Sequence, residues 1–89
     1  MADITVESTG RNAYRVTITD EDSSTSHEVI AHAVDVTRLG LGATAEDLIA
    51  ASFRFLLDRE PKESILRRFD LTVIEQYFPA YPSTIAGYL

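Results

Sequence analysis

Two histidines, His27 and His32, are the only imidazole side chains of the chain and the first candidates for acid–base or metal chemistry. They lie five residues apart in a segment whose β-branched residues predict a strand. Side chains alternate between the two faces of a strand, so an odd separation puts the rings on opposite faces unless a bulge intervenes. Neither ring has the adjacent serine and acid arrangement of a catalytic triad. We therefore expect neither a shared metal ion nor a catalytic role.

The acidic segment Asp20-Glu21-Asp22 begins like a calcium-binding loop, in which alternating carboxylates supply hard oxygen ligands. Such a loop requires glycine at its sixth position and a bidentate glutamate at its twelfth. The chain has Thr25 and Ala31 at these two positions. We therefore expect a solvated hairpin loop rather than a calcium site.

Carboxylates and basic residues alternate after residue 57. Asp58, Glu60 and Glu63 interleave with Arg59, Lys62 and Arg67. A pair of carboxylates supports general acid–base catalysis only where burial raises one of their pKa values, and the interleaved bases favour surface ion pairs instead. An enzyme is therefore the least favoured of three functional hypotheses. A cleft that encloses a carboxylate with a raised pKa would strengthen it.

The segment from Gly40 to Ala45, with the sequence GLGATA, matches the Gly-x-Gly-x-x-Ala form of the dinucleotide fingerprint. It follows a predicted strand and precedes a predicted helix. A dinucleotide site also needs a second parallel strand after that helix, but a charged turn and more helical pattern follow Asp58. We expect a glycine turn leading into a capped helix, and no cofactor.

Length and composition predict a single domain over residues 1–89. The chain has no cysteine, which excludes disulfides, thiolate zinc sites and cysteine nucleophiles. A hydrophobic fraction of 45% is too high for disorder and sufficient for one modest core, with roughly 64% of the unfolded surface buried on folding. The sequence has no signal-peptide pattern at its start and no apolar run of membrane-spanning length, so we expect a cytoplasmic protein without a membrane partner.

The net charge of −6 arises entirely before residue 54, since residues 54–89 contain five basic and five acidic residues. A chain of this charge repels nucleic acid unless it concentrates a basic patch. The candidate patch lies between Arg54 and Arg68. It contains Arg54, Arg59, Lys62, Arg67 and Arg68. A nucleic-acid-associated regulator that uses this patch is the alternative functional hypothesis.

Alternation of apolar and polar residues predicts a three-stranded antiparallel meander from about Asp3 to Val36. Ile4 and Val6 alternate in the first strand, and residues 14–18 repeat the pattern in the second. Residues 20–26 are turn-formers, and residues 28–36 predict the third strand. Its register stays open between two inward-facing sets. These are Val29, Ala31 and Ala33 in one register, and Ile30, Val34 and Val36 in the other.

A helix is predicted from Ala45 to about Asp58. Thr44 is placed to cap it, and Glu46 and Asp47 put negative charge where the helix dipole favours it. Its apolar positions spread over an arc of roughly 200°, which leaves only a narrow polar strip. The strip comprises Asp47, Ala50, Ala51, Arg54 and Asp58. An arc this wide indicates a central helix, covered by the sheet on one side and by later helices or a second subunit on the other.

Two or three short helices are predicted after this central helix. Pro61 fits the first turn of a helix over Lys62 to Phe69. A capping box at Thr72 to Glu75 begins the next, which Pro79 ends, and Ser83 is a candidate cap for a last turn. The predicted fold class is therefore α+β, with the meander packed on the central helix.

One part of the chain resembles a small family of uncharacterised bacterial proteins. It consists of SFRFLLDREPKESIL from Ser52 to Leu66, FDLTVI from Phe69 to Ile74 and YFP from Tyr77 to Pro79. The resemblance covers about a third of the chain, and REPKESIL is its most specific part. It implies a bacterial source and assigns no activity, ligand or catalytic residue to these positions.

Aromatic residues concentrate near the C-terminus, where five of the eight lie within twenty residues. Aromatic side chains dominate interface cores because each buries a large area at low rotamer cost. We predict a small protein-interaction or regulatory module that self-associates or docks a protein partner. Its contact surface is predicted to use Tyr77, Phe78, Tyr81 and Tyr88, with Arg67 and Arg68 as a charged rim.

Overall fold

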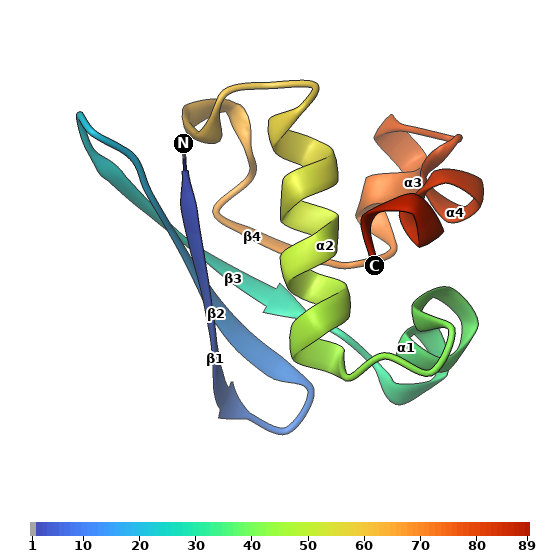
Figure 1. The fold of residues 1–89 in the computed structure, drawn as a ribbon. Helices are drawn as coiled ribbons and strands as arrows, with labels where there is room; N and C mark the ends of the chain where they lie inside the picture. The colour runs from blue at the N-terminus through green and yellow to red at the C-terminus, as the bar shows by residue number, and fades with distance from the viewer. Residues whose placement is uncertain (1) are drawn as a thin grey trace.

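The computed structural model describes residues 2–89 and has an α+β architecture (Figure 1). In chain order its elements are β1 (Asp3–Gly10), β2 (Ala13–Thr19), β3 (Ser24–Ile30), α1 (Ala33–Gly40), α2 (Ala45–Leu57), the 3₁₀ helix η1 (Lys62–Ser64), β4 (Arg68–Asp70), α3 (Val73–Tyr77), α4 (Tyr81–Thr84) and the 3₁₀ helix η2 (Ile85–Tyr88). The sheet order is β1-β2-β3-β4. Helix α2 lies between this sheet and the helices α3 and α4 (Figure 1), so the predicted central helix is confirmed.

The first two strands form where the alternation predicts them. Ile4 pairs with Ile18 and Val6 with Val16 across an antiparallel register, which directs all four side chains to the side of the sheet that α2 covers. Asn12 takes a left-handed conformation with φ of 59° in the tight β1–β2 turn, which asparagine tolerates better than most residues. The alternating pattern thus determines a hairpin with one apolar face.

The third strand begins and ends earlier than predicted. Ser24 to Ser26 pair with β2, whereas Ala33 to Val36 belong to helix α1. The reason is the short turn, in which the Asp20 carboxylate accepts hydrogen bonds from the amides of Asp22 and Ser23 at 2.9 and 3.0 Å. Closing the turn there draws the polar residues 24–26 into the sheet. Of the two registers left open, the one with Val29 and Ala31 buried is correct up to residue 31.

The helix predicted over Lys62 to Phe69 does not form, and a fourth strand begins at Arg68. Only the 3₁₀ turn η1 forms there, and β4 then runs parallel to β3 with Val29 opposite Phe69. The amide of Glu28 donates to the carbonyl of Arg67 at 2.7 Å, which continues this pairing. The free edge of β3 supplies backbone partners that a surface helix would lack, so the tertiary pairing overrides the local helical spacing.

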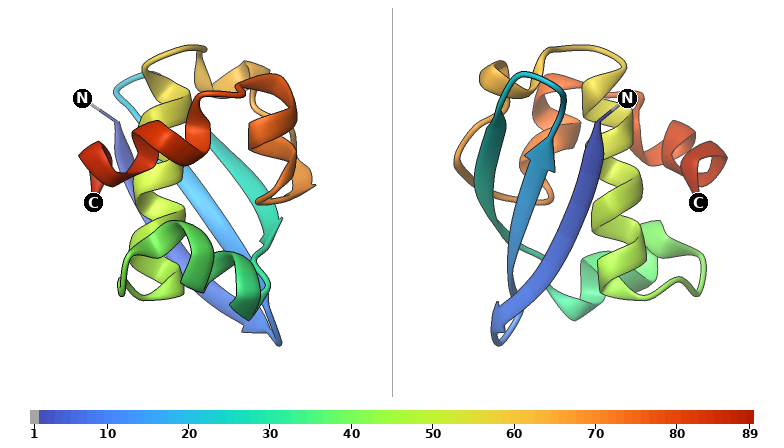
Figure 2. Two further views of the ribbon diagram at one scale, coloured as in Figure 1. Left: turned by 90° about the vertical axis from the view of Figure 1, so that its right-hand side faces the viewer. Right: turned by 60° about the vertical axis from the view of Figure 1, so that its left-hand side comes forward.

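The open face of the sheet is polar. Glu7, Arg15, Glu28 and Arg68 stand opposite one another on the four strands and alternate in charge. Arg15 pairs with Glu7 at 3.1 Å and Arg68 with Glu28 at 3.3 Å, all with exposed side chains. Within the described residues 2–89 no helix covers this face (Figure 2). It is therefore the solvent face, and exposed pairs of this kind stabilise the fold only weakly.

Helix α2 is confirmed together with its cap. The Thr44 hydroxyl accepts a hydrogen bond from the amide of Asp47 at 3.1 Å. The helix buries seven residues, and the set differs from the predicted arc at two positions: Ala51 of the predicted polar strip is buried, and Leu57 is only half-buried. The seven buried residues are Leu48, Ile49, Ala51, Ser52, Phe53, Phe55 and Leu56. The core therefore lies on both sides of this helix.

The C-terminal segment forms short turns of helix whose caps differ from those predicted. The Thr72 hydroxyl donates to the Asp70 carboxylate at 2.9 Å instead of capping α3. The Ser83 hydroxyl donates to the carbonyl of Ala80 at 3.0 Å and lies within α4, so it caps no helix. The prediction that helix α3 ends before Pro79 is confirmed.

A buried lysine connects the β2–β3 turn to η1. Lys62 is buried, and its ammonium donates to Asp20 at 2.5 Å and to Glu63 at 2.8 Å. The hydrogen bond from Lys62, joined by the two turn amides, lowers the pKa of Asp20 from 3.8 to about 2. The stabilisation that this ionised carboxylate contributes is complete above about pH 4 and is lost as the pH falls through about 2.

Replacing this carboxylate tests the connection. We expect Asp20→Asn to be less stable than the parent at pH 7, with the difference in unfolding midpoint shrinking between about pH 4 and about pH 2. Urea unfolding followed by circular dichroism at pH values from 2 to 7 measures it. Asp22→Asn makes the same charge change in the same turn and is the control. A difference for Asp20→Asn that is constant across this range would show that the ion pair does not stabilise the fold.

Candidate functional site

An apolar groove lies between the C-terminal end of α2, the segment that leads into β4, and α3. Its volume is about 170 Å³. It is lined by Leu56, Glu60, Ser64, Ile65, Leu66, Phe69, Val73, Ile74, Tyr77 and Phe78. The volume is smaller than the roughly 300 to 1,000 Å³ of drug-sized ligand sites and close to the roughly 150 Å³ of a cavity that holds one benzene ring. The groove therefore matches one bulky apolar side chain better than a whole metabolite.

Two apolar side chains at the groove are strongly exposed. Tyr77 on α3 is 67% exposed, and Leu66, between η1 and β4, is 47% exposed. Phe78 is half-buried, because its ring packs edge-on against Phe55 with centroids 5.8 Å apart. The groove therefore has one side formed by Phe78, which packs on the core, and two exposed side chains, Leu66 and Tyr77, that have few packing partners.

Glu60 is the one charged residue of the groove. Burial raises the pKa of its carboxyl group above the ordinary value, because the apolar surroundings disfavour the charged form. Among residues 2–89 no basic side chain forms an ion pair with it. Of the six residues predicted to form surface ion pairs, only Lys62 and Glu63 pair with each other in the described part of the chain, and Lys62 is buried. Sequence reasoning included Glu60 only as a surface residue, since the sequence does not reveal how deeply a residue after a helix is buried.

The four aromatic residues predicted for the contact surface separate into two groups. Tyr77 and Phe78 line the groove. Tyr81 is fully buried, so the prediction that it belongs to a surface is wrong: its hydroxyl lies 2.7 Å from the Ser52 hydroxyl in the core. Tyr88 is half-buried on Phe55 and donates a hydrogen bond to the Asp58 carboxylate at 2.5 Å.

The five basic residues between Arg54 and Arg68 are mostly engaged within the fold. Arg54 donates to the carbonyl of Tyr88 at 3.2 Å, and the Arg59 guanidinium lies 3.6 Å from the centre of the Phe55 ring. Lys62 is buried with its two carboxylates, and Arg68 faces Glu28 on the open face of the sheet. Arg67 alone of the five has no such contact among residues 2–89. Binding to nucleic acid through this set stays a prediction.

A second, polar hollow adjoins the groove and has a volume of about 310 Å³. It is lined by Ser24, Thr25, Ser26, His27, Lys62, Glu63, Ile65 and Arg67. His27 is buried there, and its Nδ1 donates to the carbonyl of Leu66 at 2.8 Å, while its Nε2 lies 2.8 Å from the Thr25 hydroxyl. The Nδ1 hydrogen bond holds β3 to the segment before β4, and the Nε2 contact lies within β3.

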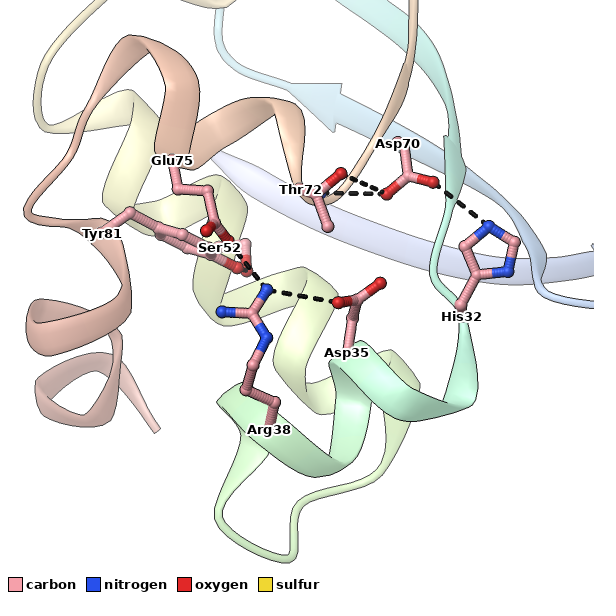
Figure 3. A network of polar contacts seen from close by, with 8 residues as sticks. All are labelled: His32, Asp35, Arg38, Ser52, Asp70, Thr72, Glu75 and Tyr81. Atoms are coloured by element: carbon pink, nitrogen blue, oxygen red, sulfur yellow. Dashed lines mark hydrogen bonds and ion pairs between the residues drawn. The ribbon is translucent and has the colours of Figure 1, made fainter.

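A polar network joins α1 to α3 and β4 (Figure 3). The Arg38 guanidinium bridges Asp35 at 3.2 Å and Glu75 at 2.8 Å. His32 lies 3.2 Å from Asp70 and is the N-cap of α1, so the prediction that it shares one strand with His27 is wrong. In a catalytic triad the nucleophile hydroxyl would donate to the imidazole, but the Thr72 hydroxyl donates to Asp70 instead. The network therefore fits a structural role, in which it holds α1 to α3 and β4.

The glycine segment from Gly40 to Ala45 connects two helices rather than a strand and a helix. Helix α1 ends at Gly40, its C-cap Leu41 is left-handed with φ of 51°, and Gly42 also has a positive φ, of 91°. The amides of the first turn of α2 already have the Thr44 cap and two acidic neighbours. The turn therefore fits the expected connection and lacks the strand that a dinucleotide site needs.

Comparisons with known proteins assign no family to this fold. In the described part of the chain, no three histidine, cysteine or acidic side chains gather where a metal ion could bind them. None of the helices formed by residues 2–89 has both the length and the apolar character that crossing a membrane requires. No family model, curated protein or solved structure matches the chain, so the resemblance to a bacterial family stays a prediction.

Proposed function

We propose that the chain is a small protein-interaction module whose docking surface is the groove between α2 and α3. The observation that carries this proposal is the pair of exposed apolar side chains, Tyr77 and Leu66, beside a groove of one side chain's volume. Tyrosine in such a position is typical of the centre of a protein interface. An apolar side chain of a partner would gain most by inserting between these two residues, because it would cover them and fill the groove.

The groove supports an enzyme less well. A general base acts on a nucleophile or a proton within hydrogen-bond reach. Glu60 makes no hydrogen bond to the hydroxyl of Ser64 or of Tyr77, which are the other polar side chains of the lining. Its raised pKa has desolvation as its cause and needs no catalytic partner to explain it. We therefore interpret Glu60 as part of the recognition chemistry of a docking surface.

Replacing the two exposed groove residues tests the proposal. The variant Leu66→Ser/Tyr77→Ser removes apolar side chains that contribute little to the core, so we expect it to fold with nearly the parent stability. We expect it to lose at least about 90% of whatever association the parent shows, whether with itself or with a partner recovered from its host. Light scattering after gel filtration and native co-purification with mass spectrometry measure the two cases.

A matched control removes the same kind of surface elsewhere. Val34 and Leu41 are 71% and 74% exposed at the start and the end of α1. We expect Val34→Ser/Leu41→Asn to keep every association of the parent. Association that survives in the groove variant would place the docking surface elsewhere. Association that nuclease treatment abolishes would favour the nucleic-acid hypothesis instead.

A further inference from the structure

Glu60 lies at the edge of the otherwise apolar groove, where the end of α2 holds it. Its amide donates to the carbonyl of Leu56 at 2.9 Å, which extends the last turn of the helix and fixes the residue beside the groove. The side chain is half-buried, and burial alone raises the pKa of its carboxyl group. Among residues 2–89 no basic side chain forms an ion pair that would offset this burial. Glu60 is therefore a partly desolvated carboxylate without a counter-charge in the fold.

The basic residues nearest to Glu60 in the sequence point to other parts of the fold. The Arg59 guanidinium lies 3.6 Å from the centre of the Phe55 ring and donates to the carbonyl of Phe55 at 2.9 Å. Lys62 is buried with its two carboxylates, and both Lys62 and Arg67 line the separate polar hollow. In the described structure none of the residues that line the groove is basic. A cation that pairs with Glu60 must therefore come with the occupant.

Covering the groove requires such a cation, and the surroundings of Glu60 favour an organic one. A purely apolar occupant would remove water from the carboxylate without supplying a counter-charge, which is unfavourable. A calcium or magnesium ion needs several oxygen ligands, and within residues 2–89 no three acidic or histidine side chains gather to supply them. An ammonium or guanidinium group pairs well with a single carboxylate. The chemistry of the groove therefore matches an apolar group that carries an organic cation beside it.

Resting on the proposed docking function, we infer that the groove binds a segment of another protein in which a bulky apolar residue lies beside a lysine or arginine. The apolar side chain would fill the space of about 170 Å³ over the buried Leu56, Ile65 and Ile74, and the cation would pair with Glu60. A second copy fits less well. A two-fold interface brings the same patch of both copies together, so two Glu60 carboxylates would approach each other with no base among the lining residues of the described groove.

Three blocked tripeptides test the charge preference while the apolar group stays constant. The probes are Ac-Lys-Phe-Lys-amide, Ac-Gln-Phe-Gln-amide and Ac-Glu-Phe-Glu-amide, each titrated from about 0.05 to 20 mM, a range suited to ligands of this size. Amide chemical shifts of the isotope-labelled parent measure binding, and we expect them to change most between Leu66 and Phe78. The lysine probe should bind at least about fivefold more tightly than the glutamine probe, and the glutamate probe most weakly, because only the lysine probe supplies a cation to Glu60.

Two matched variants separate the groove carboxylate from the overall negative charge of the chain. Glu60→Gln keeps the shape of the side chain and removes its charge, so we expect the lysine and glutamine probes to bind it within about twofold of each other. Glu63→Gln makes the same charge change in the lining of the polar hollow and is expected to keep the preference of the parent. Leu66→Ser/Tyr77→Ser should weaken all three probes, because it removes the exposed apolar contacts. Circular dichroism confirms that each variant is folded.

The outcomes distinguish the charge preference from the docking function. Probes that bind equally well and are all weakened by Leu66→Ser/Tyr77→Ser overturn the cation and leave the docking surface supported. A lysine preference that persists in Glu60→Gln overturns the pairing with this carboxylate. If no probe shifts the groove amides, the inference is overturned, and the docking function then depends on the association of the parent and its groove variant. A dimer of the parent in sedimentation velocity that Leu66→Ser/Tyr77→Ser abolishes would make a second copy the occupant and likewise overturn the inference.

Discussion

Replacing Phe55 by alanine is expected to destabilise the protein by about 3 to 5 kcal/mol. Phe55 is fully buried, and three aromatic rings meet it edge-on: Phe78, Tyr81 and Tyr88, with centroid distances of 5.8, 5.2 and 5.8 Å. A domain of 89 residues has a total stability of about 4 to 13 kcal/mol, so this single change removes a large part of it. Urea and thermal unfolding followed by circular dichroism measure the loss.

The destabilisation caused by Phe55→Ala should be largest on the side of α2 that faces the C-terminal helices. Hydrogen exchange is expected to increase first in α4 and η2, because Tyr81 and Tyr88 both pack on the Phe55 ring. Val34→Ala, which shortens an exposed apolar side chain, is the control and should change stability by less than about 0.5 kcal/mol. A Phe55→Ala variant with nearly parental stability would mean that the C-terminal helices do not pack on α2 as described.

The buried hydroxyl pair of Ser52 and Tyr81 is expected to give the second-largest effect. Ser52 donates to the carbonyl of Leu48 at 2.7 Å, so the Tyr81 hydroxyl must donate to Ser52 Oγ, also at 2.7 Å. Ser52→Ala leaves the buried phenol without an acceptor and should cost about 1 to 3 kcal/mol. Tyr81→Phe leaves the Ser52–Leu48 bond intact and should cost about 0.5 to 1.5 kcal/mol.

A double-mutant cycle separates the hydrogen bond from the packing. The variant Ser52→Ala/Tyr81→Phe leaves no buried hydroxyl unpaired, so we expect its cost to be smaller than the sum of the two single costs. Strictly additive costs would contradict the direct bond. Burial raises the pKa of Tyr81 to about 12, so the parent should lose stability as the pH rises from about 10 through about 12. Tyr81→Phe should remove that part of the alkaline loss.

The placement of the aromatic residues explains why only half of the predicted contact surface lies at the groove. The density of aromatic residues near the C-terminus indicates a region rich in apolar area, but their spacing along short helices does not determine which rings face the core. Tyr81 follows a turn that directs it toward Ser52, whereas Tyr77 is at the end of α3 and points away from the core. Burial of Glu60 likewise depends on Phe69 and α3, which approach it only in the folded chain.

Local chemistry in the sequence determined the elements whose signals are contained within them. The alternation in residues 3–18 produces the β1–β2 hairpin, and the Thr44 cap with the wide apolar arc produces α2 as the central helix. Both are stabilised by contacts within a few residues or by a single apolar face. The α+β class follows from these elements alone.

Tertiary structure alone decided the fourth strand and the groove. The spacing of Ile65, Leu66 and Phe69 is typical of a helix, yet the chain there becomes extended because β3 offers unpaired backbone groups and Phe53 offers a ring 5.8 Å from that of Phe69. These partners lie far away in the sequence, so no local pattern contains them. The groove forms between that extended segment, α2 and α3. Its lining residues come together only in the folded chain, so no sequence motif contains them.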